Sequence, residues 1–107
     1  MGDHIKTILI TGGSQRIGRE IALYLNKKNM NFIIHYNNSL VKAKELKSLI
    51  IKSGNQCEIV KGDLNKKSQI SKIIKSSKKF FGPIHFLINN ASLFLNDNVE
   101  NFSKKLW

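Results

Sequence analysis

A short run of small and polar residues near the N-terminus is the first feature of this sequence that could do chemistry. Thr11-Gly12-Gly13-Ser14 follows an apolar stretch, and an amphipathic stretch begins within a few residues of it. Glycines let the backbone come close to a ligand, and the N-terminus of a helix offers free N–H groups and a positive dipole end to a phosphate. The run predicts a nucleotide-binding turn, and its candidate ligands are Gly12, Ser14, Arg16 and Ile17.

The spacing of the glycines selects between the patterns known for such turns. The general G-x-G-x-x-G pattern does not match, and Arg16 stands where a glycine is expected. Gly12 and Gly18 do match T-G-x-x-x-x-[IL]-G. An ordinary tight turn is the alternative interpretation, but the position of the loop, after a strand pattern and before a helix pattern, favours nucleotide binding.

The end of the second apolar run bears on the choice of cofactor. Tyr36-Asn37-Asn38-Ser39 contains no acidic residue, whereas NAD-binding folds place a carboxylate there for the ribose 2′-hydroxyl. Amides and a hydroxyl do not repel a 2′-phosphate, and the guanidinium of Arg16 can bind one with two N–H groups. Both features favour NADP(H) over NAD(H), although Arg16 could also be a solvated loop arginine.

Polar residues also follow the third and fourth apolar runs. Asp63-Leu64 and Asn90-Ala91-Ser92 occupy these positions, and both segments are candidate cofactor contacts. Asp63 could instead cap the N-terminus of a helix, and the asparagines could simply form a turn. Asn89 is expected to tie the fourth strand to its neighbours.

The histidines and the single cysteine show no catalytic or metal-binding pattern. His35 and His85 fall within apolar runs, so packing or surface roles are expected for them. Cys57 is expected to be a small buried hydrophobic residue. No pair of His, Cys or acidic residues has metal-ligand spacing, and we predict no metal site.

Apolar runs alternate with helical patterns along the chain. The predicted strands are 6–10, 31–36, 56–61 and 84–89, and the predicted helices are 17–28, about 39–52, about 65–80 and about 99–107. Gly54 and Gly82-Pro83 end the second and third helices. This alternation predicts an α/β fold, a Rossmann-type doubly wound parallel sheet of about four strands in the order 3-2-1-4.

Composition limits the class of protein. The 107 residues are 41% hydrophobic and contain one cysteine, which predicts one small globular domain without an internal disulfide. No signal peptide or membrane span is evident, so a cytoplasmic protein is expected. The net charge of +11 comes mostly from scattered lysines, without interleaved aromatic residues. This pattern favours solvated helix faces over nucleic-acid or membrane binding.

Three motifs together resemble the short-chain dehydrogenase/reductase family. They are TGGSQRIG at 11–18, GDL at 62–64 and NNAS at 89–92. Within that family, Arg16, the HYNNS segment at 35–39 and Ser92 are most similar to pteridine reductases. Those enzymes commonly have a second basic residue where Asn38 stands, so its absence suggests weaker phosphate binding here.

The resemblance implies roles for the later motifs. The Asp63 carboxylate would face the exocyclic amine of adenine, and the Leu64 amide would face a ring nitrogen. Asn90, Ala91 and Ser92 would lie beside the adenosine and the nicotinamide ribose. The implied cofactor is NADP(H), and the implied reaction is hydride transfer.

The resemblance covers only the N-terminal half of such a domain. The family's Tyr-x-x-x-Lys catalytic pair is met formally by Tyr24 and Lys28, but these lie far in the chain from the family's active site, so no catalytic residue is assigned. We expect residues 1–107 to be the cofactor-binding half of one NADP-binding domain. The alternative is a non-catalytic nucleotide-binding remnant. An exposed strand edge predicts self-association or a complementing C-terminal polypeptide.

Overall fold

The computed structural model describes residues 5–14, 16–27 and 29–90. Within them the chain forms one four-stranded parallel sheet in the order β3-β2-β1-β4. The strands are β1 (Lys6–Thr11), β2 (Met30–Tyr36), β3 (Gln56–Lys61) and β4 (Phe86–Asn89). The predicted Rossmann-type α/β fold and strand order are therefore confirmed.

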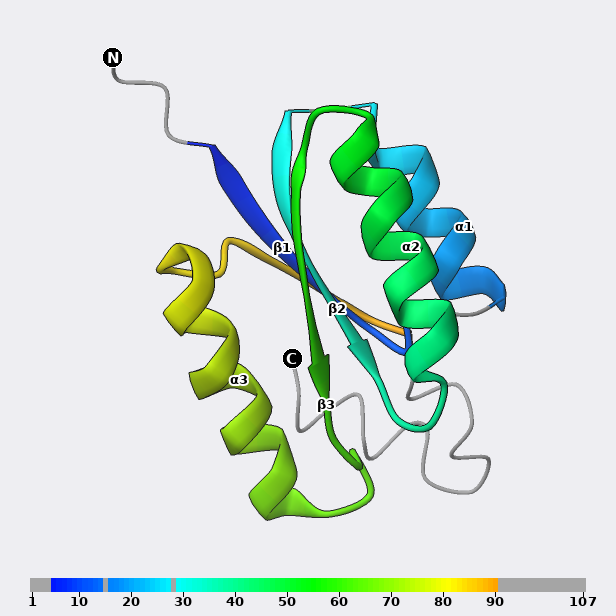
Figure 1. The fold of residues 1–107 in the computed structure, drawn as a ribbon. Coiled ribbons are helices and arrows are strands. Elements are labelled where there is room, and N and C mark those ends of the chain that lie inside the picture. The colour runs from blue at the N-terminus through cyan, green and yellow to red at the C-terminus, as the bar shows by residue number, and fades with distance from the viewer. Residues whose placement is uncertain (1–4, 15, 28, 91–107) are drawn as a thin grey trace.

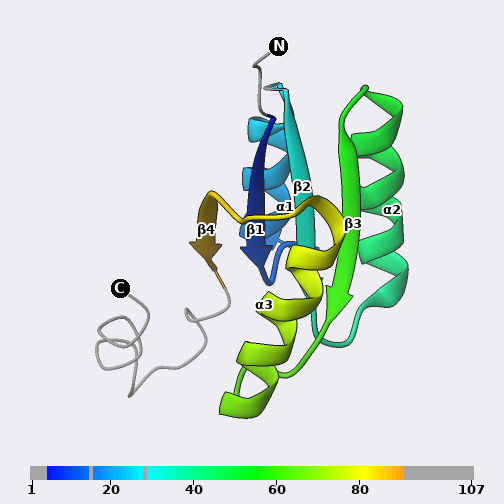
Figure 2. The same ribbon diagram turned by 90° about the vertical axis from the view of Figure 1, so that its left-hand side faces the viewer.

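Three helices cover the two faces of this sheet. They are α1 (Arg16–Leu25), α2 (Leu40–Lys52) and α3 (Lys67–Phe81). Figure 1 shows α1 and α2 together on one face and α3 on the other, and the turned view in Figure 2 agrees. This division follows from right-handed crossovers, because the chain moves one way across the sheet from β1 to β3 and returns the other way to β4.

Each face has its own core. Ile8, Ile10, Phe32, Ile34 and neighbouring residues pack under α1 and α2, and a smaller cluster lies under α3. The smaller cluster comprises Leu9, Ile33, Val60 and Ile73. Strands buried on both faces read as nearly continuous apolar runs, which explains the pattern in the sequence.

Glycines end two of the helices as predicted. Gly54 lies just beyond α2 with a φ of 107°, and Gly82 lies at the end of α3 with a φ of 81°. Residues with side chains rarely adopt such angles. The Gly82 N–H donates to the Lys78 carbonyl at 2.9 Å.

Helix α1 is shorter at its C-terminus than the sequence pattern predicted, because it ends at Leu25 rather than residue 28. The physical reason is a set of contacts with the turn before β3. Asn55 Nδ2 donates to the Asn26 carbonyl at 3.0 Å, and Asn26 Nδ2 donates to Ser53 Oγ at 2.6 Å. The Asn26 N–H still donates to the Ala22 carbonyl at 2.9 Å, but the carbonyl and side chain of Asn26 bond to this turn instead of continuing the helix.

Helix α3 begins at Lys67 rather than at about residue 65, since Lys66 occupies the N-cap, and Lys66 makes no side-chain cap. The N–H groups of Asn65 and Lys66 both donate to Asp63, to Oδ1 at 2.9 Å and to the carbonyl at 3.2 Å. A separate turn therefore precedes this helix.

Strand β4 begins at Phe86 rather than residue 84. The ring of His85 explains the difference, because its Nδ1 accepts the Thr7 N–H at 2.9 Å. That N–H is therefore bonded to a side chain rather than to a strand carbonyl. The predicted helix at 99–107 lies outside the described residues.

Candidate nucleotide-binding site

The β1–α1 loop lies at the carboxyl edge of the sheet. Strand β1 has β2 on one side and β4 on the other, and α1 and α3 lie on opposite faces. This is the switch point at which open α/β sheets bind their ligands. The loop, the connections after β2 and β3, and the end of β4 all emerge at this edge.

The glycines of the loop have distinct physical roles. Gly12 has a φ of 62°, which favours a residue without a side chain. A Cβ on Gly18 would lie 2.3 Å from the Gly12 carbonyl oxygen and 2.8 Å from the Gly13 Cα. Only glycine at position 18 lets α1 begin this close to the loop, which aims the helix N-terminus at the carboxyl edge.

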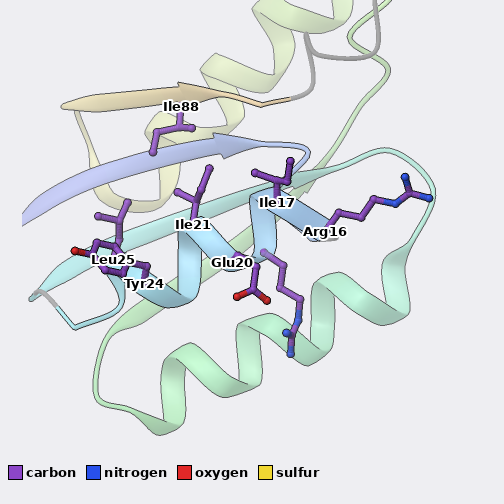
Figure 3. Close-up of a pocket in the computed structure, with 8 residues that line it drawn as sticks. Arg16, Ile17, Glu20, Ile21, Tyr24, Leu25 and Ile88 are labelled. Atoms are coloured by element: carbon purple, nitrogen blue, oxygen red, sulfur yellow. The ribbon is translucent and has the colours of Figure 1, made fainter.

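The remaining loop candidates differ in exposure. Ser14 is buried, whereas Arg16 and Ile17 are exposed at the start of α1. Arg16 has a φ of 50°, an uncommon angle for a residue with a side chain. Its side chain extends beyond the N-terminal end of α1 (Figure 3), and no described residue forms an ion pair with it. The guanidinium is therefore available to an anion.

The end of β2 carries exposed polar groups and no carboxylate. Asn37 and Asn38 are exposed, and Ser39 is half-buried at the N-cap of α2, where its side chain makes no capping bond. Tyr36 is buried, and its carbonyl accepts the Gly62 N–H at 3.1 Å. The side chains of the two asparagines are thus the accessible groups at this strand end.

Asp63 and Leu64 follow β3 at the same edge. Asp63 is half-buried, and one of its carboxylate oxygens accepts the Asn65 N–H. The carboxylate therefore caps a turn before α3 rather than the helix itself, and its other oxygen can accept from a ligand. Leu64 packs against the core under α3.

The end of β4 is tied to β1 and to the glycine loop. Thr11 Oγ1 donates to Asn89 Oδ1 at 3.1 Å, so Asn89 links two strands as predicted. Asn90 is buried, and its Nδ2 donates to the Gly12 carbonyl at 3.2 Å. Asn90 thus lies against the loop. Ala91 and Ser92 lie outside the described residues.

His35 contributes a link that sequence reasoning did not find. Of the two roles expected, packing or surface, it is buried, and its ring also bonds to two loops. Nδ1 accepts the Gly12 N–H at 2.9 Å, and Nε2 lies 2.8 Å from the Gly62 carbonyl oxygen. Alternation along the strand indicated the face on which this ring lies. Its partners could not be read from the sequence, because they lie 23 and 27 residues away.

A groove of about 780 Å³ runs beside α1, and Arg16 and Ile17 at the end of the glycine loop line part of it. In Figure 3 it lies between α1 and β4, with Ile17 and Ile21 on the side toward Ile88. Ile17 is 59% exposed, so the apolar face predicted for α1 is only partly covered in the described chain.

Tyr24 lies in this groove near the far end of α1 and is 70% exposed. Eight residues separate it from Arg16, which is about 12 Å along a helix axis. That no residue of this chain is catalytic stays a prediction, and Lys28 lies outside the described residues. No helix in the described ranges is long and apolar enough to cross a membrane.

Comparison with protein families and curated sequences gives a consistent assignment. Residues 6–107 match the family described as short chain dehydrogenase. A short-chain type dehydrogenase/reductase of Picea abies is 32% identical over 94 residues, an alignment that covers 82% of this chain and 35% of the relative.

Solved structures agree with this assignment. FolM alternative dihydrofolate reductase 1 from Brucella canis, complexed with NADP, is 30% identical with a TM-score of 0.71, covering 77% of this chain and 33% of that one. A Burkholderia cenocepacia protein assigned as a dehydrogenase, with bound NADP, is 30% identical with a TM-score of 0.77, covering 79% and 33%. The chain spans about a third of the length of these relatives.

Proposed function

Since this chain belongs to the short-chain dehydrogenase family, we propose that residues 1–107 supply the cofactor-binding part of an NADP(H)-dependent oxidoreductase. The observation that carries the proposal is the β1–α1 loop. Its closely packed glycines bring the N-terminus of α1 to the switch point of the sheet, where dinucleotide pyrophosphates bind. The catalytic residues of the domain would lie outside this segment.

Each loop at the carboxyl edge would bind a different part of the cofactor. The loop from Gly12 to Ile17, with Ser14, would hold the pyrophosphate, and the segment 36–39 would lie beside the adenosine ribose. The free oxygen of Asp63 would accept from the adenine amine, with the Leu64 amide beside it. Asn90, Ala91 and Ser92 would lie along the adenosine and the nicotinamide ribose. NADPH bound in this way supplies a hydride to the substrate.

The proposed preference for NADP(H) rests on charge. Arg16 is exposed and unpaired among the described residues, and the neighbouring end of β2 has no carboxylate to repel a 2′-phosphate. NADP bound in the two structural relatives supports the same choice.

Titration of the purified chain with NADP⁺ and NAD⁺ tests this preference. Arg16→Ala should weaken NADP⁺ binding about tenfold or more, the effect of losing one charge-assisted hydrogen-bond pair, and leave NAD⁺ binding almost unchanged. Arg19→Ala is the matched control, since it removes the same charge one turn further along α1. Equal affinities for the two dinucleotides, or no response to Arg16→Ala, would contradict the proposed role of Arg16.

We further propose a pteridine-type substrate for the whole enzyme. The HYNNS segment and the arginine in the glycine loop support it, as does the likeness to a dihydrofolate reductase, whose substrate carries a pterin ring. The direct assay measures NADPH consumption by the whole enzyme with dihydrofolate or a dihydropterin as the substrate. Consumption with simple ketones but not with pterins would reject this substrate class.

A non-catalytic nucleotide-binding module is the second candidate. It is favoured by the position of Tyr24, which lies at the far end of α1 from the loops. This candidate predicts saturable NADP⁺ binding without any NADPH consumption. Turnover by the purified chain would exclude it.

The proposed partners are the dinucleotide and either a second copy of the chain or a complementing C-terminal polypeptide. Among the described residues β4 pairs only with β1, and the groove beside α1 exposes apolar side chains. A sheet edge with no neighbouring strand among the described residues and a groove lined partly by apolar side chains both favour association. We expect no nucleic-acid partner, and a cytoplasmic location belongs to the same proposal.

A further inference from the structure

The ring of His35, which has no proposed contact with the cofactor, lies beneath the junction of two loops. The residue is 2% exposed and sits next to the C-terminal residue of β2. Its Nδ1 accepts the Gly12 N–H at 2.9 Å, and its Nε2 lies 2.8 Å from the Gly62 carbonyl oxygen. One side chain thus joins the glycine loop to the loop that begins with Gly62 and Asp63.

These two contacts determine the protonation state of the ring. A backbone N–H can only donate, so Nδ1 must present a lone pair to Gly12. A carbonyl can only accept, so Nε2 must carry the hydrogen that is donated to Gly62. Only the neutral tautomer protonated at Nε2 makes both bonds, and an imidazolium would lose the bond to Gly12.

Backbone contacts reinforce the same junction. The Gly13 N–H donates to the His35 carbonyl at 3.1 Å, and the Gly62 N–H donates to the Tyr36 carbonyl at 3.1 Å. Gly62 is itself confined, because a Cβ there would lie 2.4 Å from Ile73 Cδ1 of α3. Both loops therefore meet the end of β2 within a few ångströms of the ring.

We propose that His35 is a positioning residue that sets the spacing between two loops, acting through the Gly12 N–H and the Gly62 carbonyl. The loops are the glycine loop that begins at Gly12, here called the pyrophosphate loop, and the loop at 62–65, here called the adenine loop. His35 does not touch the cofactor. The inference rests on the proposed function, since the two loops have a shared ligand only if this site binds a dinucleotide. A rigid spacing lowers the ordering cost of binding a ligand that spans both loops.

The surroundings of the ring leave its protonation to burial and to these two bonds. The residues on the same face of β1 and β3, Leu9 and Val60, are uncharged, as is Ile73 of α3. Glu58 of β3 is paired with Lys47 at 3.1 Å. Asp63 is the acidic residue of the adenine loop, and one of its oxygens accepts the Asn65 N–H. Burial lowers the pKa of His35, and the bond to the Gly62 carbonyl opposes the shift.

Three substitutions separate the two arms of the link. His35→Asn retains an acceptor near the position of Nδ1, His35→Gln retains a donor near the position of Nε2, and His35→Leu retains neither. His85→Leu is the matched control, because His85 Nδ1 also accepts a backbone N–H, that of Thr7, but at the opposite end of β1.

The NADP⁺ dissociation constant and amide hydrogen exchange are measured on the full chain. His35→Leu should weaken NADP⁺ binding at least tenfold, with His35→Asn and His35→Gln between it and the wild type. Amide exchange should rise in both loops, at 12–14 and 62–65. His85→Leu should leave the dissociation constant within twofold, although it too removes a backbone contact.

A pH series on the wild type needs no substitution. Affinity for NADP⁺ should fall at acid pH, below the ordinary histidine pKa of about 6.5, as the pH approaches the lowered pKa of His35 and the ring gains a proton. The 2′-phosphate of NADP⁺ titrates in the same range, so its contribution is taken from His35→Asn, which has no ring to protonate. The wild type should lose affinity more steeply than this variant.

Two results would overturn the inference: a His35→Leu dissociation constant within twofold of the wild type, or faster exchange in only one loop. If the wild type binds neither dinucleotide, the proposed function fails, and amide exchange then decides the linkage separately. Faster exchange of both loops in His35→Leu but not in His85→Leu would uphold it. Amide exchange in His35→Leu that equals that of the wild type across the whole chain would reject the linkage.

Discussion

At the scale of single residues, the buried imidazole of His35 couples stability to pH. Burial lowers its pKa below the ordinary 6.5, so the unfolded chain takes up a proton at a higher pH than the folded one. The stability due to the neutral ring is complete above about pH 6.5 and is lost as the pH falls toward the lowered pKa.

We predict that the free energy of unfolding of the wild type, measured with urea, is lower at pH 5 than at pH 7. The fall should be smaller in His35→Asn, because this variant has no ring to protonate. The comparison between them removes contributions from carboxylates. A wild type and a variant with the same pH slope would argue against a neutral buried ring in the folded state.

The thiol of Cys57 should be unreactive in the folded chain. It is buried in the core under α1 and α2, and burial raises its pKa to about 12. At pH 8 only about one molecule in 10⁴ carries the thiolate, which is the reactive form.

A thiol-exchange reagent should therefore label native Cys57 far more slowly than the urea-unfolded chain. Because the chain contains one cysteine, the absorbance change reports this site alone. Equal labelling rates in native buffer and in urea would mean that β3, the edge strand that contains Cys57, opens frequently.

At the scale of elements, α1 approaches the glycine loop closely at Gly18. A Cβ at Gly18 would meet the Gly12 carbonyl oxygen at 2.3 Å, and backbone atoms cannot rotate away as a side chain can. At Gly54 a Cβ would meet nothing within 4 Å, although the φ of 107° is unfavourable for alanine.

Gly18→Ala should therefore reduce stability by about 1–3 kcal/mol and NADP⁺ affinity by at least tenfold, because the loop must move. Gly54→Ala should cost about 1–2 kcal/mol through its backbone angle and leave affinity unchanged. Urea unfolding and NADP⁺ titration of the two variants give both quantities. Unchanged cofactor affinity in Gly18→Ala would show that the loop tolerates the displacement.

At the scale of the whole molecule, the groove beside α1 and the edge of β4 favour association between copies, whereas the large net charge opposes it. Apolar side chains line the groove together with the charged residues Arg16, Arg19 and Glu20, while the chain carries a formal charge of +11. Repulsion between copies should suppress association at low salt. As added salt shortens the Debye length, repulsion weakens and association should increase.

We predict concentration-dependent self-association at about 0.3 M salt, where the Debye length is about 6 Å, measured by sedimentation. Tyr24→Lys, in the groove, should weaken it. Val41→Lys is the control, since Val41 is 68% exposed on α2 and does not line the groove. The same weakening by both variants would assign the effect to net charge rather than to the groove.

Much of the architecture could be predicted because it depends on local patterns. Strands buried on both faces read as apolar runs, and Gly54 and Gly82 end helices through backbone angles that depend on their own residue type. With four strands alternating with helices, the right-handed crossover rule leaves few possible sheet orders. The strand order 3-2-1-4 and the glycine loop at the carboxyl edge were therefore predictable.

Contacts between distant residues decided the rest. Helix α1 ends early because Asn26 bonds to the turn before β3, and β4 begins late because the His85 ring takes the Thr7 N–H. Helical periodicity predicted the apolar face of α1, but it could not indicate that Ile17 stays 59% exposed on that face.

The candidate site divides in the same way. Residue types and their spacing predicted a nucleotide-binding loop after β1 and showed that the end of β2 lacks a carboxylate. The tertiary structure decided that Gly18 lies against Gly12 and that one histidine joins two loops. The reason is physical: conformational preferences act within a few residues, whereas close packing and buried hydrogen bonds depend on which distant segments the sheet brings together.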